Sequence, residues 1–192
     1  MSEAIPRLEL DAMAPALQSA LAPRVARLNY LGEFFKCMGH QPDALLGFIQ
    51  FTESAKSGLD KRVVEIIALT VATAKDNAYE RNQHERLSVR LGFGRDWVRD
   101  VERLTPDQPS ELTEQDRSIQ RFTLSVIASE GRGSRNRLDA LAREVGASDA
   151  IAIMMVIARY TTHAMLVASL ELVPPVPSIF EDGFDVESGG QQ

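Results

Sequence analysis

Apolar residues recur at intervals of three and four along most of the chain, the spacing that places them on one face of a helix. Gly and Pro are concentrated between these periodic segments, where they favour turns. The pattern predicts an all-α fold of seven or eight helices, without a convincing alternating strand. The expected helices span 23–38, 42–56, 61–75, 77–91, 95–103, 113–129, 134–145 and 148–172.

Cap and breaker residues support these boundaries. Pro23 and Pro42 suit the first turn of a helix, because backbone N–H groups there have no partner within the helix. Gly146 suits a helix end. The expected N-caps are Asp60, Thr113 in a capping box with Asp116, Ser134 and Ser148. The apolar run IAIMMVI could be a buried strand, but its length and flanking caps favour a helix.

Two segments differ from an ordinary half-buried helix. Segment 61–75 carries apolar residues on more than one face, so we expect it to be buried centrally. Segment 77–91 is polar almost throughout, so core packing alone does not account for it. Residues 60–87 and residues 148–170 follow the same order along the chain. In each, an apolar helix leads to a polar position and then to a histidine. An internal repeat and a chance similarity both explain this order.

Composition bounds the class of protein. Of the 192 residues, 44% are hydrophobic and 25% are charged, which is typical of a globular chain. Residues 1–180 are expected to form a single all-helical domain. Residues 181–192 are acidic and rich in glycine, and we expect a disordered tail there.

The charge balance excludes a large nucleic-acid interface. The formal net charge is -6, and no tract of clustered Lys and Arg occurs. The N-terminal residues lack the apolar core of a signal peptide, and no run of about 20 consecutive apolar residues could span a bilayer. We therefore expect a cytoplasmic protein without a nucleic-acid or membrane partner.

The chain has one cysteine, Cys37, which excludes a disulfide or a dithiol redox centre within a single chain. Its apolar neighbours predict a small, half-buried hydrophobic residue.

Glu65 is the first candidate for chemistry. It lies within the apolar run VVEIIAL, where an unpaired carboxylate would be costly to bury, so it needs a partner or a proton. The alternative is a surface stripe formed with Arg62 and Leu69 at helical spacing.

Asn77, Glu80 and His84 are spaced so that they share one face of a continuous helix. Glu80, one turn before His84, can orient the imidazole and stabilise its protonated form, which makes the pair a candidate acid/base unit. Glu and His at this spacing are also common on solvated helices, so spacing alone does not assign a catalytic role.

The run of residues 59–98 resembles the central segment of the carboxymuconolactone decarboxylase and alkylhydroperoxidase-like (AhpD-like) family. In the peroxidase branch, a glutamate-bearing apolar helix precedes a CxxCxxxH motif. Glu65 matches that glutamate, and His84 matches the histidine. Asn77 and Glu80 stand where the resemblance would place the two cysteines.

This departure argues against dithiol peroxidase activity, which needs a nucleophilic thiolate and a resolving thiol. Cys37 matches no position of the motif. The γ-carboxymuconolactone decarboxylase branch also lacks the cysteine pair and has a glutamate four residues before the histidine, as Glu80 and His84 are placed. Because the chain has Glu65 as well, it resembles a third, thiol-free branch.

The resemblance implies a cofactor-free lyase or isomerase that acts on a small carboxylated or lactone substrate. In this hypothesis His84 is the general acid/base, Glu80 orients it and Glu65 relays protons, while Asn77 and Tyr79 bind substrate by hydrogen bonds. No cofactor is expected.

Residues 158–172 resemble the last helix of the family, which makes Tyr160 and His163 candidates to line the same cavity, within one chain or across a subunit boundary. A helix-packing role for Tyr160 and a solvated or core position for His163 are the alternatives. The resemblance also implies a homo-oligomer, a trimer or a hexamer.

Two other hypotheses start from the same residues. Glu65, Glu80 and His84 are ligand types that suit a divalent metal, although the paired Glu-x-x-His motifs of di-iron bundles are absent. Alternatively, the chain is an oligomeric binding protein that has kept the scaffold and lost the chemistry.

Overall fold

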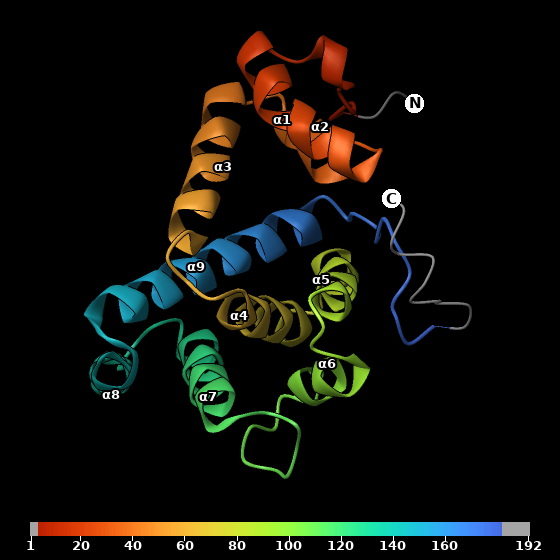
Figure 1. Ribbon diagram of the computed structural model, residues 1–192. Helices are drawn as coiled ribbons and strands as arrows, with labels where there is room; N and C mark the ends of the chain where they lie inside the picture. Colours follow the sequence, from red (N-terminus) through yellow and green to blue (C-terminus); the bar gives the residue numbers. More distant parts are fainter. Residues whose placement is uncertain (1–3, 182–192) are drawn as a thin grey trace.

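The computed structural model describes residues 4–181, and within that range the protein is all-α (Figure 1). The predicted fold class is therefore confirmed. The elements are the 3-10 helix η1 (Leu10–Ala12) and the α-helices α1 (Pro15–Leu28), α2 (Glu33–Met38), α3 (Pro42–Lys56), α4 (Lys61–Ala74), α5 (Ala78–Arg90), α6 (Arg95–Glu102), α7 (Glu114–Ser129), α8 (Arg135–Val145) and α9 (Ala147–Ser169).

Helix α4 forms the centre of the molecule and contacts α5, α7 and α9 (Figure 1). Nine of its 14 residues are buried, as its apolar residues on more than one face predicted. The Asp60 side chain accepts a hydrogen bond from the N–H of Arg62 and caps the helix as expected. Because α4 is buried on all sides, its one internal carboxylate, Glu65, is held inside the protein.

Two hydrophobic clusters stabilise the fold. The larger cluster joins α4 to α6, α7, α8 and α9 and includes the indole of Trp97. The smaller one joins α1, α2 and α3 to the end of α9 and includes Leu17, Phe34 and the buried side chain of Cys37. In Figure 1, α1 and α2 lie across α9 from α6, α7 and α8. The polar residues of the site lie between the two clusters.

The predicted helix 23–38 is wrong in its bounds. Helix α1 begins at Pro15, contains Pro23 and ends at Leu28, and the next residue, Asn29, caps it in a left-handed conformation with φ of 59°. Helix α2 begins only at Glu33. Pro15 occupies the first turn, and burial of α1 against the smaller cluster offsets the backbone hydrogen bond that Pro23 lacks.

Of the predicted N-caps, Ser134 is confirmed in position only and Ser148 is wrong. Ser134 occupies the N-cap position of α8, but its side chain makes no capping hydrogen bond. Ser148 lies inside α9, and Gly146 with φ of 89° both ends α8 and precedes α9. The direct passage from one helix to the next needs a left-handed backbone, which glycine adopts without a steric cost.

Helix α9 is the one element of residues 4–181 that is long and apolar enough, by length and composition, to cross a membrane. Half of its most apolar 18-residue window is buried in the protein. It also carries the buried polar residues Arg159 and His163. These features are typical of the core helix of a globular domain.

The segment after α9 returns along α5. Asn82 donates to the carbonyl of Val176, and Glu85 accepts hydrogen bonds from Ser178 and from the N–H of Ile179. These contacts hold the outer side of α5, the helix that carries His84. The expected disordered tail lies, from residue 182 onward, outside the described residues.

Candidate functional site

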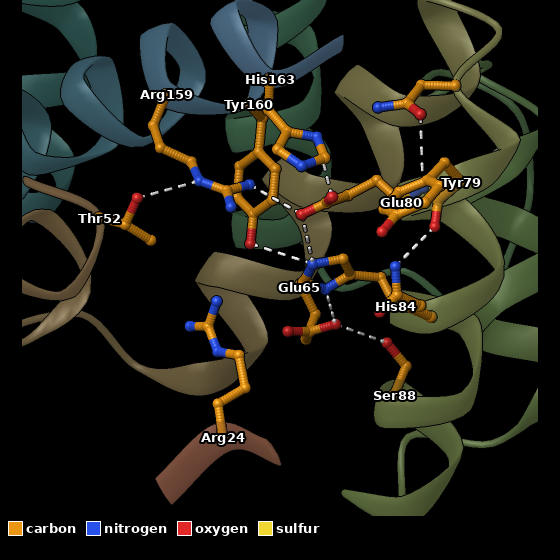
Figure 2. A network of polar contacts seen from close by, with 12 residues as sticks. Arg24, Thr52, Glu65, Tyr79, Glu80, His84, Ser88, Arg159, Tyr160 and His163 are labelled. Carbon is orange, nitrogen blue, oxygen red and sulfur yellow. Dashed lines mark hydrogen bonds and ion pairs between the residues drawn. The ribbon is translucent and has the colours of Figure 1, made fainter. Parts of the chain in front are cut away.

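Side chains from α4, α5 and α9 meet at His84, which is buried (Figure 2). Its Nδ1 lies 2.7 Å from Oε2 of Glu65, and its Nε2 lies 3.2 Å from the hydroxyl of Tyr160. Glu80 places Oε1 3.4 Å from the same Nε2. The structure therefore brings together the three residues that the sequence singled out as an acid/base unit, and adds Tyr160.

Glu65, and not Glu80 as expected from the sequence, makes the short hydrogen bond that orients His84. Glu65 is 3% exposed, and its carboxylate also accepts a hydrogen bond of 3.2 Å from the hydroxyl of Ser88. Of the two alternatives for Glu65, the buried and paired carboxylate is confirmed and the surface stripe is wrong. Because Glu65 holds Nδ1, the imidazole presents Nε2 toward Tyr160 and Glu80.

Glu80 lies among three cationic or potentially cationic groups. Arg159 donates from Nη1 to its Oε1 over 2.7 Å, and Nδ1 of His163 lies 2.9 Å from its Oε2, without the alignment of a hydrogen bond. Arg159 also donates to the hydroxyl of Thr52, which ties α9 to α3. Glu80 is thus anchored mainly by α9, and it adds a second negative charge beside His84.

These contacts shift the pKa values of the buried groups. Burial alone would lower the pKa of His84, but the carboxylates of Glu65 and Glu80 outweigh it and raise that pKa to about 9. Burial opposes ionisation of Glu80, yet His163, Arg159 and His84 hold its pKa well below the usual range. Burial raises the pKa of Tyr160 well above its usual value. At neutral pH His84 is therefore an imidazolium, next to the carboxylate of Glu80 and the neutral phenol of Tyr160.

The array borders a cavity of about 180 Å³ that is open to solvent on one side. Five cationic side chains and one carboxylate, Glu80, line it, in a chain whose formal net charge is -6. The cationic residues are Arg24, Arg27, Lys56, Arg90 and Arg159. His84 and His163 also line the cavity, so a bound molecule would meet both imidazoles.

No family model matches the sequence, and no curated protein is similar to it at a significant level. Solved structures are similar in fold. An alkylhydroperoxidase AhpD core structure, that of an uncharacterized peroxidase-related protein from Ralstonia eutropha JMP134, superposes with a TM-score of 0.77. The match covers 90% of this chain and 94% of that one at 17% identity. The protein has the AhpD-like fold.

Two further structures share the AhpD-like fold. A variant of the debrominase Bmp8 in complex with 2,3,4-tribromopyrrole gives a TM-score of 0.74 at 20% identity, over 90% of this chain and 92% of that one. A protein of unknown function from Agrobacterium tumefaciens, described as a putative antioxidant defence protein AhpD, gives a TM-score of 0.66 at 18% identity. That match covers 73% of this chain and 96% of the other.

This AhpD-like chain lacks the paired cysteines at its site. Its single cysteine, Cys37, packs in the smaller hydrophobic cluster and is 3% exposed. Position 80 carries a carboxylate that is committed to Arg159. Dithiol chemistry therefore has no pair of thiols to use within this chain.

The expected substrate-binding residues are Asn77 and Tyr79. Both lie at the start of α5, where their side chains bond to other groups of the protein. Asn77 is the N-cap, and its Oδ1 accepts from the N–H of Glu80 over 3.3 Å. It lines a second cavity of about 130 Å³ and not the one beside His84. The Tyr79 hydroxyl accepts from the N–H of Phe34, and burial raises the pKa of this phenol to about 12. Tyr79 lines both cavities.

Tyr160 and His163 reach the site from within the same chain. Tyr160 contacts His84, and His163 contacts Glu80. His163 also stacks near Phe34, with ring centroids 4.4 Å apart. Both candidates from the last helix therefore belong to the polar array, but of the two only His163 lines the cavity beside His84. Tyr160 is buried behind it, contrary to the expectation that it would line the cavity, and a part for His163 in substrate binding stays a prediction.

Sequence reasoning missed several residues of the site, namely Arg24, Thr52, Lys56, Ser88 and Arg159. Arg159 had a signal, because it is the one cation within the otherwise apolar run of α9. A buried arginine in such a run needs a carboxylate partner. The others have no comparable signal, since their neighbours in sequence are ordinary amphipathic helix residues.

The metal hypothesis gains no support from the geometry. Within residues 4–181 no three His, Cys, Asp or Glu side chains are grouped as metal ligands. Arg159 lies against Glu80, and Glu65 is bound to His84 and Ser88. These contacts orient the carboxylates toward hydrogen-bond donors of the protein.

Proposed function

We propose that this AhpD-like chain is a cofactor-free lyase or isomerase that acts on a small carboxylated or lactone substrate, with His84 as general acid/base. One observation carries the proposal. The imidazole of His84, fixed through Nδ1 by Glu65, borders a cavity whose charged lining residues are mainly cationic. A proton donor and a site for an anion thus occur at the same place.

His84, Glu65 and Glu80 each have a chemical task in this proposal. In a decarboxylation, carbon dioxide leaves, the electron pair of the broken bond stays on carbon, and the protonated His84 delivers its Nε2 proton to that carbon. Glu65 stabilises the imidazolium and fixes the ring. Solvent then returns a proton to His84, and Glu80, 3.4 Å from Nε2, is placed to relay it.

The proposal is preferred over two others. Dithiol peroxide reduction needs two thiols, and the chain has one cysteine, remote from the motif. A binding protein without chemistry would be expected to have a closed, apolar pocket around His84, whereas this cavity is polar and open. The complex of Bmp8 with tribromopyrrole supports a ring-sized ligand for a protein of this fold.

Solvent deuterium incorporation tests the proposal even when the natural substrate has not been identified. A panel of small lactones and cyclic carboxylates is incubated with the protein in deuterium oxide, and loss of carbon-bound proton signals and release of carbon dioxide are followed by NMR. Wild type should exchange or convert a member of the panel. His84→Gln should lose at least 100-fold in rate, as is typical when a general acid/base is removed.

His40→Gln is the matched control, because His40 is exposed and its Nε2 lies against the carbonyl of Pro6, away from the cavity. It should keep the wild-type rate. Full activity of His84→Gln on a converted substrate would show that the proposed mechanism is wrong.

A further inference from the structure

Lys56 is a cation without an anionic partner at the wall of the cavity. It is the last residue of α3 and half-buried. Among residues 4–181, no carboxylate lies within ion-pair distance of its ammonium group, whose contact is with the Tyr160 ring, 5.3 Å from the centroid. Arg159, by contrast, is paired with Glu80. The positive charge of Lys56 is therefore available to a ligand.

Arg24 adds a second, weakly paired cation from α1. Figure 2 shows its side chain directed toward the polar array. Its nearest carboxylate, that of Glu53, lies 3.4 Å away and is 64% exposed. Burial lowers the pKa of Arg24 and of Lys56, and the nearby charge of Arg159 lowers both further. Partial burial of these cations carries a desolvation cost, and a bound anion would offset that cost.

The size and walls of the cavity limit what the anion can be. A cavity of about 150 Å³ holds a benzene molecule, and this one measures about 180 Å³. Tyr30, Phe34 and Phe35 contribute aromatic walls. One six-membered ring with a carboxylate fits this volume.

We propose that Lys56 and Arg24 form a carboxylate-binding subsite, and that the cavity takes a small monocyclic carboxylate whose ring lies between this subsite and His84. This inference rests on the proposed function in one respect, because it identifies the bound carboxylate with the substrate of His84. The binding itself does not depend on any reaction.

Direct binding of benzoate and of its neutral analogue benzamide tests the subsite. Calorimetry or ligand-observed NMR is performed on wild type, Lys56→Met and Lys56→Arg. Wild type should prefer benzoate over benzamide by roughly tenfold or more, as expected for a charge-assisted contact. Lys56→Met should lose most of this preference, and Lys56→Arg should keep it. Lys61→Met, at an exposed lysine outside the cavity, is the control and should behave as wild type.

Thermal unfolding shows whether a loss of binding reflects a loss of structure. Because Lys56 has no ion pair to lose, Lys56→Met should unfold at the wild-type temperature or above it. Equal affinity of wild type for benzoate and benzamide would overturn the inference. A full preference retained by folded Lys56→Met would overturn it as well.

The two proposals fail separately. If His84-dependent proton exchange occurs but benzoate is not preferred, the subsite is wrong and the acid/base function stands. If benzoate binding depends on Lys56 but His84→Gln keeps full activity, the subsite stands and the acid/base function is wrong.

Discussion

At the scale of single residues, two carboxylates keep His84 protonated. Burial alone would favour the neutral imidazole. Glu65 contacts Nδ1 and Glu80 lies near Nε2, so the ring is attracted to a negative charge on both sides. Opposite charges at such distances in a buried site outweigh desolvation, which explains a pKa of about 9.

Glu65→Gln should lower the pKa of His84 well below 9. The amide keeps a hydrogen-bond acceptor but removes the charge, so burial then opposes the imidazolium with only Glu80 to offset it. The His84 ring proton resonances, followed by NMR across the pH range, report the value. Glu53→Gln, at an exposed carboxylate, should leave it unchanged. A pKa that stays near 9 in Glu65→Gln would show that Glu65 does not cause the shift.

The stability of the fold should fall as pH rises through about 9. The pKa of His84 is raised in the folded state, so its contribution is complete below the unfolded value of about 6.5 and is lost as the pH passes about 9. Urea unfolding measures the free energy of unfolding at about pH 6 and at about pH 9.5. Between these two pH values it should fall by roughly 1–3 kcal/mol more for wild type than for His84→Gln. Parallel pH profiles for the two proteins would contradict the assignment.

The Arg159 and Glu80 pair should be coupled in stability. Arg159→Met leaves a buried carboxylate without its cation and should lower the free energy of unfolding by about 3 kcal/mol or more. Adding Glu80→Gln to that variant should recover part of the loss, because it removes the uncompensated charge. Chemical denaturation of both single variants and the double variant measures the coupling. A double variant no more stable than Arg159→Met would count against it.

At the scale of the elements, capping is decided by backbone geometry as well as residue type. Thr113 forms the predicted capping box with Asp116, and both hydrogen bonds are present. Ser148 has the same kind of side chain but lies within α9, because Gly146 allows α9 to begin earlier. The sequence pattern of a cap is therefore not sufficient to place the start of a helix.

Thr113→Ala should destabilise the protein by about 1 kcal/mol, the usual loss when an N-cap side chain is removed. Ser148→Ala is its matched control, and it should change stability by less than about 0.5 kcal/mol because alanine suits a helix interior. Urea unfolding of the two variants checks the difference. Equal losses would mean that Ser148 has a capping role after all.

At the scale of the whole molecule, α9 presents an apolar face that the rest of residues 4–181 leaves exposed. Ile151, Met155 and Met165 are 52%, 41% and 65% exposed, and with Ala158 and Thr162 they follow the alternating spacing of three and four that suits helix pairing. No charged side chain interrupts this face. It is a suitable interface for the homo-oligomer expected from the sequence, with a second copy of the chain as the partner.

Light scattering during size-exclusion chromatography tests this expectation. Wild type should elute as an oligomer, and the double variant Ile151→Glu, Met155→Glu should shift toward the monomer because it places like charges in the interface. Ala140→Glu, at an exposed position of α8, is the control and should keep the wild-type mass. A monomeric wild type, or a double variant of unchanged mass, would exclude this interface.

The sequence by itself determined the features that depend on the spacing of nearby residues. Helical periodicity predicted α3 to α7 to within a residue or two at each end. A carboxylate in an apolar run favoured a buried, paired Glu65 over a surface stripe. The shared face of Glu80 and His84 also followed from the helix repeat. These features depend on residues within a few turns of one another, so local rules suffice for them.

The tertiary structure decided which side chains from distant segments of the chain meet. Glu65 rather than Glu80 orients His84 across 19 residues, and Arg159 reaches Glu80 across 79. Lys56 and Arg24 converge on the same cavity from α3 and α1. Such pairings depend on how the helices pack, because packing alone sets which side chains share a low-dielectric space and which are left without a partner.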